Sequence, residues 1–202
     1  MLDATAGLPA DQRKTLLTAQ RQSLDRYVNT QVLIAKPSCA DQRSAVLASA
    51  NLDDALDDAT AASAILDRAI TQTRQRLGNK LASDRNLADN LRIYLLRAKR
   101  TAELDDYQHQ LIAAYPDDYV YAYRYGRNLV ETGRPAQALP YLTQAADKAY
   151  GANRLAVALQ RVKALKALHR DDEANKVAGD VLETNGPWFP KQADALKAAL
   201  KA

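Results

Sequence analysis

The stretch that decides the fold is YVYAYRYGRNLVETGRPAQALPYL, residues 119–142. Apolar and aromatic residues recur three or four positions apart on both sides of Gly133, a period typical of two amphipathic helices. Gly133 supplies the turn between them, and Pro135 starts the second helix, where its missing N–H costs little. Gly126 and Ala138 are small enough to let two antiparallel helices approach closely. The segment therefore predicts a helical hairpin.

This hairpin resembles a tetratricopeptide (TPR) repeat, because its small and apolar residues fall at the spacing of that family. The matching positions are Tyr125, Gly126, Leu129, Gly133, Ala138, Leu142 and Ala145. The resemblance implies an all-α fold, in which antiparallel helix hairpins stack into a TPR-like right-handed α-solenoid.

Weaker copies of the hairpin organise the rest of the chain, and we expect about ten helices in a single helical-repeat domain. Its expected parts are an N-terminal helix and linker (1–42), a degenerate hairpin (43–76), a repeat (85–118), the best repeat (119–152), a further repeat (153–188) and a C-terminal capping helix (189–202). The further repeat has Arg161 where the family has an apolar residue. Trp188 and Phe189 precede the capping helix and are expected to cover the open end of the stacked core, or alternatively to dock a further domain.

Composition argues against several classes of function. The chain has 202 residues, is rich in Ala and Leu, and contains only 7 Gly and one Phe, a balance that favours helices over sheets. No apolar stretch approaches the roughly 18 residues of a membrane helix, so we expect no membrane insertion. The 28 basic and 24 acidic side chains form no basic stripe, so nucleic acid is not an expected partner.

The sequence carries no signature of catalysis. His109 and His169 lie far apart and outside any metal-ligand spacing, so we expect no metal site. No glycine-rich phosphate loop is present, and we expect no cofactor and no enzyme activity. Cys39 is the single cysteine and falls near the start of an expected helix, where a thiol pKa can be lowered. A reactive thiol and an isolated small residue both remain open for it.

The candidate binding residues come from the two sides of the helix that starts at Tyr119. Tyr121 and Tyr125 occupy the family's packing positions, while Tyr119, Tyr123 and Arg127 share the other side, since residues four apart lie on one face. In TPR proteins that side lines a concave groove.

Equivalent positions in the neighbouring repeats add Asn86 and Asn90 before, and Lys163 after, this helix. Aromatic, Arg and Asn side chains together suit an extended peptide: Asn bonds its backbone, Arg meets a carboxylate and Tyr supplies contact area. The sequence therefore indicates a noncatalytic scaffold that binds a protein or peptide. The competing interpretation is that Tyr119 and Tyr123 pack against a neighbouring hairpin and that Arg127 is merely solvated.

A second resemblance concerns context. The run from Tyr115 to Gly126 is similar to the helical-repeat region that follows a thioredoxin-fold domain in some secreted bacterial proteins. This resemblance implies an alternative function, as the accessory C-terminal domain of a larger periplasmic thiol-disulfide protein, with the upstream thioredoxin-fold domain as a partner. It suggests a periplasmic or secreted location, although we identify no signal peptide in the sequence.

Overall fold

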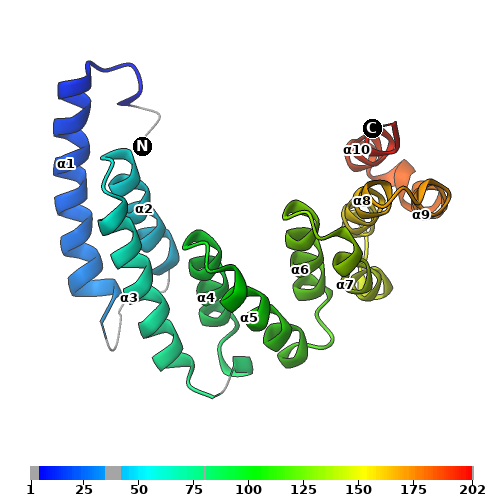
Figure 1. The fold of residues 1–202 in the computed structure, drawn as a ribbon, viewed down its shortest axis with the longest axis horizontal. Helices are drawn as coiled ribbons and strands as arrows, with labels where there is room; N and C mark the ends of the chain where they lie inside the picture. The colour runs from blue at the N-terminus through cyan, green and yellow to red at the C-terminus, as the bar shows by residue number, and fades with distance from the viewer. Residues whose placement is uncertain (1–4, 35–41, 80, 202) are drawn as a thin grey trace. The chain divides into compact units, whose positions relative to one another are not determined.

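The computed structural model describes residues 5–34, 42–79 and 81–201, and this part of the chain contains ten α-helices and no strand (Figure 1). The helices are α1 (Ala10–Tyr27), α2 (Gln42–Ala55), α3 (Ala59–Leu77), α4 (Arg85–Arg97), α5 (Thr101–Ala114), α6 (Tyr119–Glu131), α7 (Pro135–Lys148), α8 (Ala152–Ala167), α9 (Asp171–Asn185) and α10 (Pro190–Lys201). A single wider turn of helix, Val28–Val32, prolongs α1. The all-α prediction with about ten helices is confirmed. Cys39 lies outside the described residues.

Aspartate side chains cap the N-termini of three helices. The carboxylates of Asp58, Asp84 and Asp118 each accept a hydrogen bond from a backbone N–H in the first turn of α3, α4 and α6, at 2.9 to 3.0 Å. These bonds satisfy amides that have no partner inside the helix. Asp117 does not cap α6; its carboxylate lies 2.8 Å from the Lys148 ammonium.

One turn geometry recurs between the paired helices. Residues 57, 99, 133 and 169 all have a positive φ, from 55° at Lys99 to 73° at Gly133. After each of them, the next N–H bonds the carbonyl five residues earlier, as in Arg134 to Leu129 and Arg170 to Leu165. This pattern satisfies the free carbonyls at the end of the first helix of each pair. The turns at Asp57, Lys99, Gly133 and His169 therefore join four pairs of consecutive helices in the same way.

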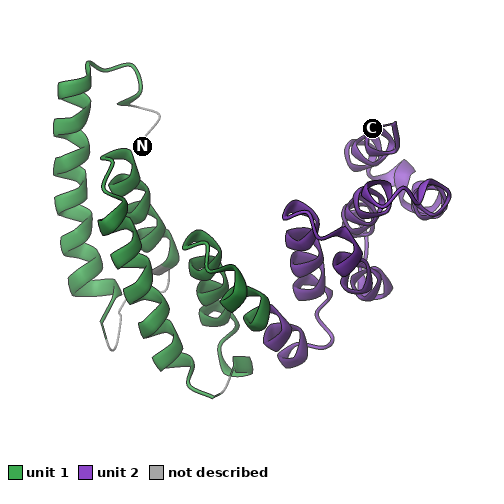
Figure 2. Cartoon of the chain, viewed as in Figure 1, with its two compact units in different colours: residues 1–107 green, residues 108–202 purple. Residues whose placement is uncertain are grey.

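The chain divides into two compact units, residues 1–107 and 108–202, with the division inside α5 (Figure 2). In the first unit, α2 packs on α1 and α3, and α3 packs on α4. Its buried residues are mostly Leu, Ile, Val and Ala, and they include Leu17, Leu66, Ile70 and Leu95.

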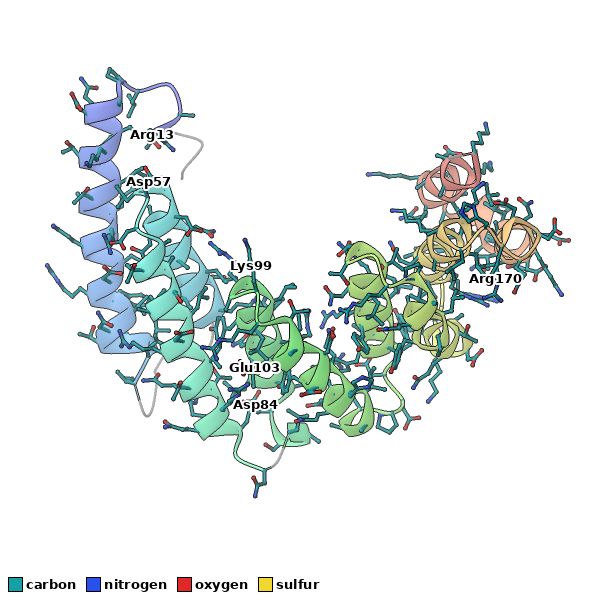
Figure 3. All side chains as sticks on the ribbon, viewed as in Figure 1. Arg13, Asp57, Asp84, Lys99, Glu103 and Arg170 are labelled. Carbon is teal, nitrogen blue, oxygen red and sulfur yellow. The ribbon has the colours of Figure 1, made fainter. Side chains whose placement is uncertain are left out.

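An ionic cluster joins three helices of the first unit. The Arg21 guanidinium on α1 lies 2.7 Å from the carboxylate of Asp53 on α2 and 2.9 Å from that of Asp58, the cap of α3. Asp53 is buried, and its pKa is raised first by that burial, an effect that the Arg21 charge opposes. Farther along this unit lies Glu103 on α5 (Figure 3). Its carboxylate pairs with Arg74 and Arg100.

In the second unit, α6 packs on α7, α7 on α8, α8 on α9, and α10 on both α8 and α9. Helices α6 and α7 approach closely at Gly126: a Cβ added to this residue would lie 2.6 Å from Cγ of Leu142. The predicted role of Gly126 as a close-contact residue is confirmed. Ala138 is fully buried at the same crossing.

The end of the second unit differs in one respect from expectation. Phe189 packs against the core formed by α8, α9 and α10, as its predicted covering role requires. Trp188 is 78% exposed, so the expectation that both aromatic side chains cover the core is wrong for Trp188. The reason is geometric, since adjacent residues of a short helical turn point in different directions.

Candidate functional site

Helix α6 separates its residues cleanly into a core side and an outer side. Tyr121, Ala122, Tyr125, Gly126 and Leu129 are buried. Tyr119 and Tyr123 on the other side are half-buried, and Arg127 is exposed. The division follows from the 3.6-residue period, which brings residues four apart onto one face.

The Tyr119 side chain is engaged within the unit. Its ring meets the ring of Tyr150 edge-on, with centroids 5.8 Å apart, and its hydroxyl is hydrogen-bonded to the Asn153 side chain. Burial is the first cause of the raised pKa of Tyr119. Both partners flank the turn between α7 and α8, so Tyr119 fastens α6 to that turn.

Tyr123 and Arg127 form a pair one helical turn apart. The Tyr123 ring packs against the apolar cluster of Ala122, Ala145 and Val157, which leaves it half-buried. The Arg127 guanidinium donates from Nε to the Glu131 carboxylate at 2.7 Å and is also hydrogen-bonded to the Tyr123 side chain. These bonds, led by that to Glu131, raise the pKa of Arg127. The result is an oriented, solvent-facing cation beside an aromatic ring.

Lys163 lies on α8, which packs against α6. The Lys163 side chain is exposed. The next residue, Ala164, is buried in the apolar cluster that also contains Tyr125, and Tyr123 packs against this same cluster. We refer below to Tyr123, Arg127 and Lys163 as the α6–α8 face.

Asn86 and Asn90 lie on α4, in the first unit. The Asn86 side chain is exposed. Asn90 is only 9% exposed, because it falls one position before the core residue Leu91 and its helix packs on α3. Of the two asparagines, Asn86 alone presents its side chain to solvent.

One arrangement that the sequence analysis did not anticipate surrounds His109. Its Nε2 lies 3.3 Å from the Tyr125 hydroxyl and its Nδ1 lies 3.3 Å from the Tyr141 hydroxyl, and both tyrosine rings contact the imidazole edge-on. The three rings join α5, α6 and α7. No sequence spacing links these residues, since His109 and Tyr141 are 32 residues apart.

Comparison with solved structures identifies the architecture. The chain is similar to the crystal structure of YrrB, a TPR protein with an unusual peptide-binding site, with a TM-score of 0.53 over 96% of this chain and 92% of that one. The fold is TPR-like. Sequence identity across this match is 12%, a level at which the likeness concerns the fold alone.

No family model and no curated protein matches the chain. Nothing in the comparisons supports the resemblance to a thioredoxin-associated region, which stays an expectation from sequence. In the part of this TPR-like chain that the structure describes, no helix is both long and apolar enough to cross a membrane. Within those same residues, no three His, Cys, Asp or Glu side chains are grouped to hold a metal ion.

Proposed function

We propose that this protein is a noncatalytic scaffold that binds a protein or peptide segment on the α6–α8 face. The observation that carries the proposal is the pair of Tyr123 and Arg127, where an exposed guanidinium held by the Glu131 carboxylate lies one helical turn from a half-buried aromatic ring. Support comes from the TPR-like fold and from the similarity to YrrB, a TPR protein with an unusual peptide-binding site.

The chemistry of this face favours a peptide with an acidic residue next to an apolar one. Lys163 offers an exposed cation, and Arg127, whose Nε is bonded to Glu131, keeps its two terminal nitrogens as donors to a ligand carboxylate. The Tyr123 ring supplies apolar contact area at small entropic cost. We do not include Tyr119 among the proposed binding residues, because its side chain already contacts Tyr150 and Asn153. Asn90 is not included because it is buried. Asn86, in the first unit, remains proposed as a separate backbone-binding residue.

The proposal is tested with a displayed library of random twelve-residue peptides, followed by affinity measurement of the selected peptides. The Arg127→Glu/Lys163→Glu variant reverses both charges at exposed positions and leaves the apolar packing intact. We expect it to weaken binding of the selected acidic peptides at least tenfold, about 1.4 kcal/mol or more.

A matched control reverses charge elsewhere on the second unit. Lys191→Glu on α10 changes an exposed cation in the same way and should leave those affinities within a factor of two. If the double variant binds as the wild type does, the α6–α8 face is not the site. Thermal melts of all three proteins should lie close together, since none of these changes removes buried apolar area and the exposed Arg127–Glu131 pair is worth only about 0.2–0.5 kcal/mol.

A further inference from the structure

A charged cleft lies within the second unit, between α7, α8 and α9. Its volume is about 510 Å³, inside the range of roughly 300–1,000 Å³ typical of small-ligand sites. Alanine and valine side chains form part of its wall. The charged residues that line it are Asp147, Arg154, Arg161, Glu173, Lys176 and Asp180.

The periodicity of two helices explains why these residues meet. Arg154, Ala158 and Arg161 recur at intervals of four and three on α8, and Glu173, Val177 and Asp180 do so on α9, so each set lies along one face. Arg161 and Lys163, two residues apart on α8, point about 200° apart around its axis. The cleft is therefore distinct from the α6–α8 face, and a ligand bound in the cleft does not depend on the proposed function.

Arg161 is the unusual residue of the cleft. Among the described residues, no hydrogen-bond acceptor meets its Nε, although that atom is buried. Burial lowers the pKa of Arg161, an effect opposed by the charge of Asp147. A buried guanidinium N–H without an acceptor costs free energy, more so because the group is charged. The repeat expected from the sequence has an apolar residue at this position, and no hydrogen bond from Nε explains an arginine there.

The positive and negative charges that line the cleft do not cancel. Both carboxylate oxygens of Glu173 accept hydrogen bonds from Arg170, at 2.6 and 2.8 Å, and Arg170 lies at the turn between α8 and α9 (Figure 3). Glu173 is therefore neutralised from outside the cleft. Three cations, Arg154, Arg161 and Lys176, then stand against the carboxylates of Asp147 and Asp180. The excess of positive charge favours an anionic ligand.

We propose that this cleft is a second binding site, which takes an acidic side chain of a peptide segment and bonds its carboxylate to the Arg161 guanidinium, which lines the cleft. A carboxylate accepts the two parallel N–H donors of a guanidinium edge. The volume exceeds what a lone carboxylate fills, and the apolar wall formed by Ala158, Val177 and Val181 suits the aliphatic part of neighbouring residues.

The test uses the full chain, labelled with nitrogen-15, and follows the Nε–Hε resonance of Arg161 by NMR. The probes are the blocked peptide acetyl-Ala-Val-Glu-Val-Ala-amide, its counterpart with Gln in place of Glu, and inorganic phosphate. We expect the Glu peptide to shift the Arg161 resonance in a saturable way and the Gln peptide to leave it in place. No shift with the Glu peptide, or an equal shift with the Gln peptide, would overturn the proposal. An equal response to phosphate would overturn the assignment to peptide carboxylates.

Variants separate binding from folding. Arg161→Leu restores the apolar residue of the TPR pattern, so we expect an unchanged or higher Tm together with at least tenfold weaker binding of the Glu peptide. Arg161→Lys keeps the charge but lacks Nε–H and the planar fork, and should also weaken binding. Lys191→Gln on α10 removes an exposed cation outside the cleft and should bind as the wild type does. Binding that survives Arg161→Leu in a folded protein would refute the anchoring role.

Discussion

The α-carbon of Gly126 lies so close to the Leu142 side chain that a Cβ at residue 126 would stand 2.6 Å from Cγ and 2.7 Å from Cδ2 of that leucine. The Ala138 carbonyl oxygen would be 3.3 Å away. Leu142 is itself fully buried, so it has little room to move. This contact sets how closely α6 and α7 pack, and with them the hairpin that presents Tyr123 and Arg127.

Gly126→Ala is therefore expected to destabilise the protein by about 1–3 kcal/mol, the usual cost of overpacking a core. The helix propensity of alanine, worth about 1 kcal/mol over glycine, works against this cost and does not outweigh it. Urea unfolding measures the change. Gly179→Ala is the matched control: residue 179 lies in α9 with nothing within 4 Å of an added Cβ, so there the substitution should stabilise by about 0.5–1 kcal/mol. Equal effects of the two substitutions would contradict the close contact at Gly126.

The pair of Arg21 and Asp53 should be sensitive to loss of either partner. Arg21→Ala leaves the buried Asp53 carboxylate without its nearby cation, a change that typically costs about 3 kcal/mol or more. Arg26→Ala, on an exposed position of the same helix, should stay within about 0.5 kcal/mol of the wild type. The double variant Arg21→Met/Asp53→Leu should recover much of the loss, since it removes both charges. Chemical denaturation measures the free energy of unfolding of the wild type and the three variants. An unchanged free energy in Arg21→Ala would show that Asp53 needs no nearby cation.

Asp58 should contribute to the loss of stability in acid. The hydrogen bond from the Ala61 amide, followed by that from Arg21, lowers the pKa of Asp58 below its usual value of 3.8. A carboxyl whose folded pKa is lowered stabilises the fold above its unfolded pKa, and this contribution disappears as the pH falls through the folded value. Asp58→Asn keeps a good N-cap but cannot titrate. Its unfolding free energy should therefore vary less below about pH 4 than that of the wild type, as measured by urea unfolding between about pH 2.5 and 6. Parallel pH profiles would argue against the lowered pKa.

Trp188 and Phe189 should respond oppositely to truncation. Trp188 is the single tryptophan and is 78% exposed, so Trp188→Ala is expected to change stability by less than about 0.5 kcal/mol. Phe189 packs on the α8–α10 core, and its loss should cost about 2 kcal/mol or more. Fluorescence gives an independent check, because acrylamide should quench Trp188 in the folded protein nearly as efficiently as in urea. Strong protection from quenching would mean that Trp188 is covered in solution.

Substitutions at residues 133 and 169, which both have a positive φ, should change the stability of the protein in opposite directions. His169 has a φ of 57° and Gly133 a φ of 73°, a region in which a residue with a Cβ loses about 1–2 kcal/mol. His169→Gly should therefore stabilise the protein by up to about 1 kcal/mol, while Gly133→Ala should destabilise it by a similar amount. Thermal and urea unfolding of both variants provide the measurement. A destabilising His169→Gly would indicate that the imidazole makes a contact worth more than the backbone strain.

The sequence by itself determined where the helices of the best hairpin begin. Glycine turns and helix-starting prolines act on their immediate neighbours, so α6 begins at Tyr119 and α7 at Pro135, as predicted. The match of small residues at Gly126 and Ala138 likewise indicated the hairpin and the TPR-like fold, because close packing of two helices needs small side chains at the crossing. These are local or nearly local constraints.

Only the tertiary structure decided which polar and aromatic side chains of α6 are engaged with neighbouring residues and which reach solvent. Tyr119 and Tyr123 occupy equivalent positions on the same side of α6. In the structure, the α7–α8 turn places Tyr150 and Asn153 against Tyr119. Tyr123 stays half-buried and Arg127 exposed. Arg21 and Asp53 form an ion pair although they are 32 residues apart in the sequence. His109 and Tyr141 are also 32 residues apart and lie within 3.3 Å of each other. Helical periodicity states which side of a helix a residue occupies, whereas burial and charge pairing depend on which other helix covers that side.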